Sequence, residues 1–461
     1  MAKKTLFKRN DTVVLTIEDI TNLGFGVGRC EGAVVFVSGA VTGDVIEAKI
    51  IKTASSYYIG KLLRIIKSSP LRVSDRCDNT RCRSCAYRDI SYEEELKIKR
   101  GTVISAFAKA GLSDVEILPT LPSPRLMGYR NKAQYPITRD KNGDYRIGFY
   151  APKSHTVCEA AECAMAPKIF SEILELLRGF FKKHNISTYD ETSGTGLLRH
   201  IYLRRSETFS EVLLTVVING NALPHSDELC RLVTEQFPEI CGILLNINTA
   251  DTNIILGDEY VTLFGRDYIN DVLAGVKLRI SASSFYQVNH GSATLIYERA
   301  RELAALNKND TLLDLFCGAG SIGLSMAADC RELIGIEIVE SAVECARLNA
   351  KENGIENASF YIGDAANTEE FLKIAETERG ETIRPDVVIL DPPRAGSAEK
   401  LLEFIATLAP RRVVYISCNP TTLARDVEIM KRLGFAADKV LPVDMFPMTG
   451  HVESVVCLSR K

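Results

Sequence analysis

The sequence predicts an α/β protein of three domains: an N-terminal OB-like β-barrel (residues 1–67), a central α+β domain (residues 68–280) and a C-terminal doubly wound sheet (residues 281–461). Three observations predict this fold. A chain of 461 residues is longer than one hydrophobic core usually supports. Short strand patterns punctuated by glycine fill the first segment, whereas strand and helix patterns alternate in the last one. The 46% hydrophobic and 25% charged residues are typical of a globular protein.

The first segment combines apolar alternation with turn signals. The alternating runs lie at residues 12–17, 34–37, 45–50 and 57–66, and glycine-rich turns separate them. So many short strands in so few residues indicate a small closed barrel. The segment carries 10 Lys and Arg against 6 Asp and Glu, and OB-like barrels with a basic face often bind nucleic acid. We therefore expect it to bind RNA, although a barrel that only packs against its neighbour would show the same strand pattern.

The central domain bears a cluster of cysteines. Cys77, Cys82 and Cys85 have the spacing Cys-x4-Cys-x2-Cys, and further cysteines follow. Thiols spaced in this way bind either Zn²⁺ or an iron–sulfur cubane. Structural zinc sites more often have two Cys-x2-Cys pairs, but the spacing alone leaves both metals open. The same domain has a charged helical stretch at residues 91–110 and an amphipathic helix near residues 168–183.

The C-terminal domain alternates strands with helices. Apolar strand runs lie at residues 311–317, 333–338, 358–362, 387–390 and 412–417, with helical patterns between them. This order predicts a doubly wound parallel sheet. Two further strand-like runs, at residues 439–446 and 452–458, are joined by a short loop. A short connection predicts a terminal antiparallel hairpin at the edge of the sheet.

A glycine-rich turn after the first of these strands predicts a cofactor site. The run Asp314-Leu-Phe-Cys-Gly-Ala-Gly-Ser-Ile-Gly323 precedes a helix, and Glu337 ends the next strand. The same arrangement binds the ribose and phosphates of NAD, so the turn alone does not separate NAD from S-adenosylmethionine (SAM). Three features favour SAM: Asp314, placed to face the methionine moiety; Asp364, placed to reach an adenine; and the terminal hairpin.

The reaction is predicted from residues at the ends of the fourth and fifth strands. Asp391 begins the run Asp-Pro-Pro-Arg394, and Cys418 lies in Ser-Cys-Asn-Pro. Ligands of such sheets bind at the carboxyl ends of the strands, where a thiol can act as a nucleophile. C5 of a pyrimidine becomes nucleophilic only after a group adds to C6, and Cys418 suits that addition. The C5 proton must then leave, and Glu453 could accept it. A buried cysteine and a solvated strand-end acid are the ordinary alternatives.

These motifs together resemble the RNA (uracil-5-)-methyltransferase family, especially its ribosomal RNA members with an N-terminal TRAM barrel and an iron–sulfur cluster. The resemblance covers nearly the whole chain: the barrel, the cysteine segment, Phe285-x-Gln287-Val288-Asn289, DLFCGAG, DPPRAG, SCNP and the final HVE. It implies a SAM-methyltransferase sheet with Cys418 as nucleophile and Glu453 as base. It also implies four residues that contact SAM: Gln287, Phe316, Glu337 and Asp391.

The resemblance favours a [4Fe–4S] cluster over zinc. Cys77, Cys82 and Cys85 would be ligands, with Cys163 as the fourth and Cys158 as its competitor. The chain departs from the family in one respect, since the family usually has five residues between the first two cysteines and this chain has four.

The charge distribution indicates the partner. Residues 1–155 carry 26 Lys and Arg against 16 Asp and Glu, whereas residues 156–461 carry 30 against 43. A basic front part suggests contact with a polyanion, and the resemblance implies 23S rRNA. A tRNA uracil-5 methyltransferase, an inactive RNA-binding ribosome-assembly factor and a nicotinamide oxidoreductase are the alternatives. We expect a monomeric cytoplasmic protein with reduced thiols and no membrane span.

Overall fold

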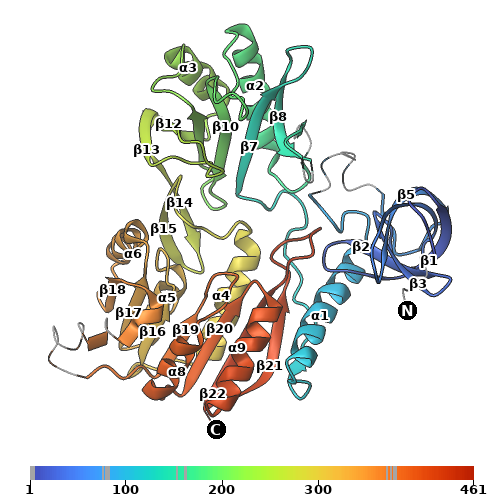
Figure 1. Cartoon of the computed structure of the whole chain (residues 1–461). Helices are drawn as coiled ribbons and strands as arrows, with labels where there is room; N and C mark the ends of the chain where they lie inside the picture. Colours follow the sequence, from blue (N-terminus) through green and yellow to red (C-terminus); the bar gives the residue numbers. More distant parts are fainter. Residues whose placement is uncertain are drawn as a thin grey trace. The chain divides into compact units, whose positions relative to one another are not determined.

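The computed structural model describes residues 6–74, 77, 82, 84–151, 154–159, 163–369, 372, 373, 376, 380 and 382–460 (Figure 1). The chain forms two compact units. One comprises Met1–Ser123, Cys418–Arg425 and Asp438–Ser454, and the other comprises Pro124–Ser417, Asp426–Ala437 and Val455–Lys461. Across these described ranges, no helix is long and apolar enough to cross a membrane.

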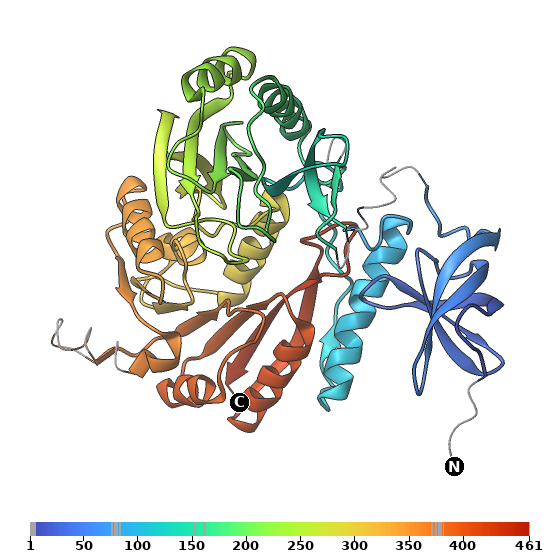
Figure 2. The ribbon, with the colours of Figure 1, turned by 45° about the horizontal axis from the view of Figure 1, so that its top comes forward.

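Five strands form a closed barrel in the order β1-β2-β3-β5-β4 (Figure 2). Inward side chains alternate with outward ones along each strand, so that Val35, Val37, Ile46 and Ala48 are fully buried. The OB-like barrel is therefore confirmed. The strands are β1 (Thr12–Ile20), β2 (Phe25–Cys30), β3 (Ala33–Ser38), β4 (Val45–Thr53) and β5 (Tyr58–Lys67).

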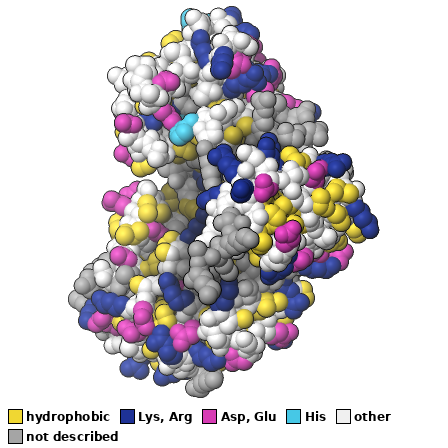
Figure 3. All heavy atoms as spheres, turned by 45° about the vertical axis from the view of Figure 1, so that its right-hand side comes forward, with side chains coloured by type: hydrophobic (Ala, Val, Ile, Leu, Met, Phe, Trp, Pro, Cys, Tyr) yellow, Lys and Arg dark blue, Asp and Glu magenta, His cyan; other side chains and the backbone are white. Residues whose placement is uncertain are grey.

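The outer surface of the barrel mixes charge with apolar area. Val14, Ile51 and Leu63 expose 54%, 45% and 48% of their surface. On the face of the molecule drawn in Figure 3, dark-blue Lys and Arg side chains lie among yellow apolar ones. Such a surface is typical of nucleic-acid binding, because cations attract the phosphates and apolar groups contact the bases.

Helix α1 (Tyr92–Lys109) follows the cysteine segment and leads to the short strand β6 (Glu116–Ile117). The central sheet of seven strands then has the order β13-β12-β11-β10-β7-β8-β9. Its apolar core is covered by α2 and α3, because Phe170, Leu177, Leu229 and Val233 pack against the strands. The elements are β7 (Lys132–Arg139), β8 (Tyr145–Tyr150), β9 (Val157–Glu159), α2 (Lys168–Lys183), β10 (Leu198–Arg205), β11 (Val212–Ile218), α3 (Ser226–Gln236), β12 (Ile240–Ile247) and β13 (Glu259–Gly265), and the hairpin β14 (Tyr268–Leu273) and β15 (Val276–Ser281) follows.

The C-terminal sheet has the order β18-β17-β16-β19-β20-β22-β21-β6, and helices cover both of its faces (Figures 1 and 2). Its first five strands are parallel, which confirms the predicted doubly wound sheet. The strands are β16 (Thr311–Leu315), β17 (Glu332–Glu337), β18 (Ala358–Ile362), β19 (Val387–Leu390), β20 (Arg412–Ser417), β21 (Phe435–Val443) and β22 (Glu453–Arg460), and the helices are α4 (His290–Ala304), α5 (Ser321–Met326), α6 (Glu340–Glu352), α8 (Glu399–Leu408) and α9 (Pro420–Arg432).

The end of this sheet contains one feature that the sequence did not predict. Strands β21 and β22 are neighbours joined by a short connection, which requires an antiparallel pair. Strand β6 pairs in parallel with β21, with Glu116 opposite Lys439 and Ile117 opposite Val440. Two residues are too few for a strand pattern, and their partner lies far along the chain, so this pairing becomes visible only in the folded molecule.

Candidate functional site

Four of the predicted site residues lie at the carboxyl ends of adjacent parallel strands. Phe316 directly follows β16, and Glu337 is the last residue of β17. Asp391 directly follows β19, and Cys418 directly follows β20, with Leu390 opposite Tyr415 in the register of these two strands. Loops at this edge bind the ligands of doubly wound sheets, because the strand order reverses here and leaves a crevice.

The turn between β16 and α5 has a strained backbone. Phe316 has a φ of 63°, and Gly318 and Gly320 have φ values of 54° and 78°. A bulky non-glycine residue such as Phe is strained in this left-handed region, and strained residues cluster at functional sites. A Cβ atom added to Gly318 would meet no other atom within 4 Å. The open space beside this backbone is where a ligand can approach it closely.

Glu337 and its neighbours form the part of the site that fits a nucleoside. The Glu337 carboxylate accepts hydrogen bonds from the backbone N–H groups of Gly318 (3.1 Å) and Val339 (2.9 Å). Ile338 and Val339 are 62% and 50% exposed. A fixed carboxylate suits the two hydroxyl groups of a ribose, and the exposed apolar side chains suit the adenine ring. The described residues therefore fit SAM.

Asp314 is placed differently from the prediction that it faces the cofactor. Its side chain is fully buried, and Oδ2 accepts the backbone N–H of Gly323 in α5 at 2.9 Å. Oδ1 has no hydrogen-bond partner among the described residues. Burial raises the pKa of Asp314 to about 7, and the nearby Asp391 carboxyl adds to this effect. Loss of hydration likewise raises the pKa of Asp391 to about 7.

The segment that carries Gln287 is held by the central sheet. The side-chain amide of Asn131 donates to the carbonyl of Gln287 at 2.8 Å, and the backbone N–H of Asn131 donates to Val288 at 2.9 Å. The buried guanidinium of Arg204 donates to the carbonyl of Ser284 at 2.7 Å. Asn131 and Arg204 therefore fix the backbone on both sides of Phe285, which is 70% exposed.

Cys418 lies between a buried strand and the start of helix α9. Cys418 is half-buried. The next residue, Asn419, caps the helix, because its side-chain oxygen accepts the N–H of Thr421 at 3.1 Å and its carbonyl accepts the N–H of Leu423 at 3.0 Å. The positive end of a helix macrodipole favours negative charge nearby, so this position suits a thiolate nucleophile.

Glu453 begins β22 and is 6% exposed. The segment before it is anchored to α1 by Lys99, whose Nζ donates to Asp444 (2.5 Å), Glu95 (2.8 Å) and the carbonyl of Phe446 (3.0 Å). All three charged side chains are fully buried. These bonds determine the path of the chain that leads to Glu453.

Gly450 lies three residues before Glu453 and packs against the barrel. A Cβ atom at Gly450 would collide with the carbonyl oxygen of Asn22, in the turn between β1 and β2, and would lie 3.2 Å from the hydroxyl of Tyr87. The backbone N–H of Tyr87 donates to the carbonyl of Met448 at 2.9 Å. Sequence reasoning missed Lys99 and Gly450. The only local signal was the Glu95–Lys99 spacing of four residues, which is also typical of a solvated helix face.

The predicted cluster ligands differ in their exposure. Cys77, Cys82, Cys85 and Cys163 are half-buried. Cys158 is 5% exposed and lies within β9, where it pairs with Phe149 of β8. The half-buried loop position of Cys163 suits a metal ligand better than the buried strand position of Cys158.

The chain is similar to known proteins over its full length. Residues 234–461 match the family model described as tRNA (uracil-5-)-methyltransferase, and residues 7–63 match the TRAM domain. It is 38% identical to an RNA methyltransferase of Clostridium acetobutylicum, over 100% of this chain and 99% of the relative. It is 36% identical to one of Oceanobacillus iheyensis, with the same shares of each chain.

A solved structure resembles the whole molecule. The tRNA (uracil-54, C5)-methyltransferase of Pyrococcus abyssi, in complex with S-adenosyl-L-homocysteine, superposes with a TM-score of 0.77 at 26% identity. The match covers 96% of this chain and 100% of the other. The structure that matches was thus solved with the demethylated product of SAM bound.

Proposed function

Since the chain belongs to the RNA (uracil-5-)-methyltransferase family, we propose that it methylates C5 of one specific uridine in 23S rRNA. The observation that carries the proposal is the position of Cys418, directly after β20 and in the strand next to the one that precedes Asp391. Transfer to an exocyclic amine would need no such thiol, because the amine itself is a nucleophile. Methylation of C5 of a pyrimidine does need such a nucleophile, because C5 becomes reactive only after a group adds to C6.

Cys418 and Glu453 divide the chemistry between them. The Cys418 thiolate forms a bond to C6 of uracil, and the electrons of the C5–C6 double bond move to C5 and the C4 carbonyl as an enolate. SAM supplies an electrophilic methyl group, which C5 takes. Glu453 then removes the C5 proton, the double bond re-forms, and the Cys418 sulfur leaves C6 with the electrons of its bond. The products are 5-methyluridine, S-adenosylhomocysteine, a restored thiolate and a protonated Glu453.

Four residues are proposed to hold SAM. Glu337 would accept both ribose hydroxyls, and the backbone of Phe316 and the following glycines would lie against the methionine end. Gln287 and Asp391 would contact the methionine moiety near the methyl group. The support for these roles is the position of Phe316, Glu337 and Asp391 at adjacent strand ends and the anchoring of Gln287 by Asn131.

We also propose a [4Fe–4S] cluster on Cys77, Cys82, Cys85 and Cys163. Its role would be to stabilise the segment and to position RNA, since uracil methylation needs no electron transfer. Iron and sulfide analysis of protein purified without oxygen tests this proposal. We expect about four irons per chain for four thiolate ligands, and substitution of Cys163 by Ser should remove them, whereas Cys158→Ser should not. Zinc in place of iron would contradict the proposal.

The substrate is tested by methyl transfer to unmodified RNA. The protein is incubated with labelled SAM and either ribosomal or transfer RNA, and the methylated nucleotide is mapped by mass spectrometry. We expect 5-methyluridine at one position of 23S rRNA. Methylation of tRNA alone would contradict 23S rRNA as the substrate and would favour tRNA, the substrate named for the Pyrococcus protein. RNA binding without any methylation would favour an assembly factor instead.

A further inference from the structure

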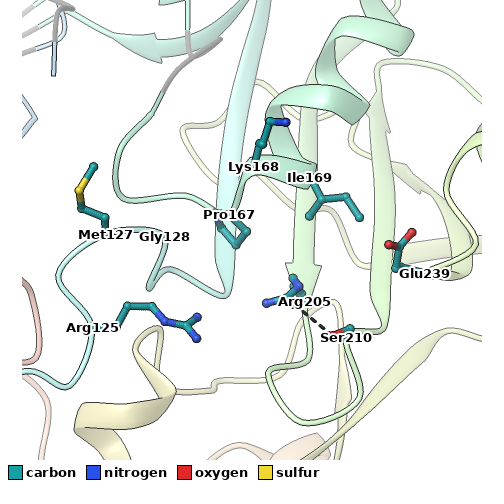
Figure 4. A pocket seen from close by; sticks show the side chains of 9 residues that line it. All are labelled: Arg125, Met127, Gly128, Pro167, Lys168, Ile169, Arg205, Ser210 and Glu239. Atoms are coloured by element: carbon teal, nitrogen blue, oxygen red, sulfur yellow. Dashed lines mark hydrogen bonds between the residues drawn. The ribbon is translucent and has the colours of Figure 1, made fainter. Parts of the chain in front are cut away.

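A cavity in the second compact unit lies beside the connection before β7 and the first residues of α2 (Figure 4). Its volume is about 340 Å³, within the range of about 300–1,000 Å³ that is typical of small-ligand sites. Its wall includes Arg125, Met127, Lys168, Arg205 and Glu239. Neither the methyl transfer nor the predicted SAM site uses this cavity.

Two guanidinium groups of the wall are held by one carboxylate. Nη2 of Arg125 lies 2.7 Å from Oε1 of Glu207, and Nη1 of Arg205 lies 3.3 Å from Oε2. Arg205 also donates to the hydroxyl of Ser210 at 3.1 Å. In Figure 4 the two guanidinium groups face each other, while Lys168 points away from them. The shared carboxylate orients both groups, and two guanidinium groups side by side in a cavity wall suit the oxygens of a phosphate.

The rest of the wall suits a nucleotide more than a bare anion. The N-terminus of helix α2 lies there and adds positive potential to that of the guanidinium pair. The first turn of the helix has no acidic residue that would reduce this potential. Met127 is 51% exposed and offers an apolar surface for a base. Glu239 is exposed and can accept hydrogen bonds from an exocyclic amine or a 2′-hydroxyl group.

The cavity is also connected to the cofactor segment. The backbone N–H of Arg205 donates to the carbonyl of Asn131 at 2.7 Å, and the side chain of Asn131 donates to the carbonyl of Gln287 at 2.8 Å. Asn131 thus connects Arg205 in the cavity wall to Gln287, a predicted SAM contact. We propose that this cavity binds one nucleotide of the substrate RNA, other than the methylated uridine, with its phosphate on Arg125 and Arg205. The inference rests on the proposed function, since it takes RNA as the substrate.

The test compares Arg125→Gln with Lys182→Gln. Each removes one positive charge from an ion pair, but Lys182 lies in the last turn of α2, where it pairs with Asp144 at 2.8 Å. Binding of a fluorescent fragment of 23S rRNA is measured by anisotropy at several salt concentrations, and SAM binding verifies the fold. We expect Arg125→Gln to weaken RNA binding about five- to tenfold and to reduce the slope of log K against log salt by about 0.7–0.9, the loss of one phosphate contact.

Lys182→Gln should leave both the affinity and the slope within error of the wild type. Arg125→Lys should recover part of the affinity, because it restores the charge without the two-pronged geometry. Equal effects of the two glutamine variants would overturn the inference while leaving the proposed function intact. A wild-type protein that binds no RNA would overturn both.

Discussion

At the scale of single residues, the two proposed catalytic groups have different surroundings. Cys418 is half-buried at the start of α9, where the helix end favours a thiolate. Glu453 is almost fully buried at the start of β22. A nucleophile must be accessible to the uracil ring. A carboxylate that acts as a general base gains proton affinity from a dry environment. The exposure of each residue is consistent with its proposed role.

RNA that contains 5-fluorouridine separates the two roles. Fluorine at C5 cannot leave as a proton does, so the wild-type protein should remain covalently attached to this RNA and migrate as an adduct on a denaturing gel. Cys418→Ala should form no adduct and no product but should still bind SAM. Glu453→Gln should accumulate an adduct even with ordinary uridine RNA, because the C5 proton stays in place. A fully active Cys418→Ala variant would exclude the mechanism.

Asp314 predicts a pH dependence of stability. Its folded pKa is about 7, above the value of about 3.9 expected when unfolded. Between pH about 4 and about 7, the carboxyl group of Asp314 is therefore protonated in the folded state and ionised in the unfolded state. The contribution of Asp314 to the free energy of unfolding decreases as the pH rises through this range. We expect Asp314→Asn, which keeps an acceptor for Gly323, to be less sensitive to pH over this range and more stable at pH 8. Urea unfolding of both proteins measures this, and parallel pH profiles would contradict it.

At the scale of elements, helix α1 supports the segment that leads to β22. Lys99 is the shared partner of Glu95 and Asp444. Burial raises the pKa of Glu95 to about 7, although Lys99 opposes the shift. Tyr92 adds a further bond to Asp444 at 2.9 Å. Lys99 thus joins α1 to the segment that leads to β22 through two buried carboxyl groups.

Lys99→Met tests this network against Lys97→Met on the same helix. Loss of Lys99 removes the cation that two buried carboxyl groups share and should lower the free energy of unfolding by about 3–5 kcal/mol. Lys97 is 62% exposed and pairs with Glu93 on the helix surface, so its loss should cost about 0.5 kcal/mol or less. Urea unfolding followed by circular dichroism measures both. Similar midpoints for the two variants would show that the buried network contributes little.

At the scale of the whole molecule, charge is distributed unequally along the chain. The first 155 residues carry ten more basic than acidic residues, and the remainder carries thirteen more acidic ones. The basic part includes the TRAM barrel, and the acidic part includes the carboxyl groups of the proposed SAM site. RNA binding should therefore depend strongly on salt, because phosphate contacts release counterions.

Neutralising the barrel should weaken RNA binding without affecting SAM. Lys52, Lys61 and Lys67 are exposed on β4 and β5. Changing all three to Gln should reduce the salt slope of RNA binding by up to about 2.7 if each contacts a phosphate. The matched control changes Lys141, Lys182 and Lys183, which are exposed in the central domain. Anisotropy with the rRNA fragment measures both, and an equal loss in the control would show that total charge, rather than the barrel, sets the affinity.

The sequence by itself determined the barrel, the doubly wound sheet and the position of the proposed site residues at the ends of strands. These depend on local patterns: an alternation of two residues, a glycine turn after a strand, or a thiol after another strand. The tertiary structure alone decided the pairing of β6 with β21, the direction of Asp314 toward α5 and the burial of Lys99. Lys99 and Asp444 are 345 positions apart. No local pattern records such a contact, because only the packing of distant segments excludes water from both charges and pairs them.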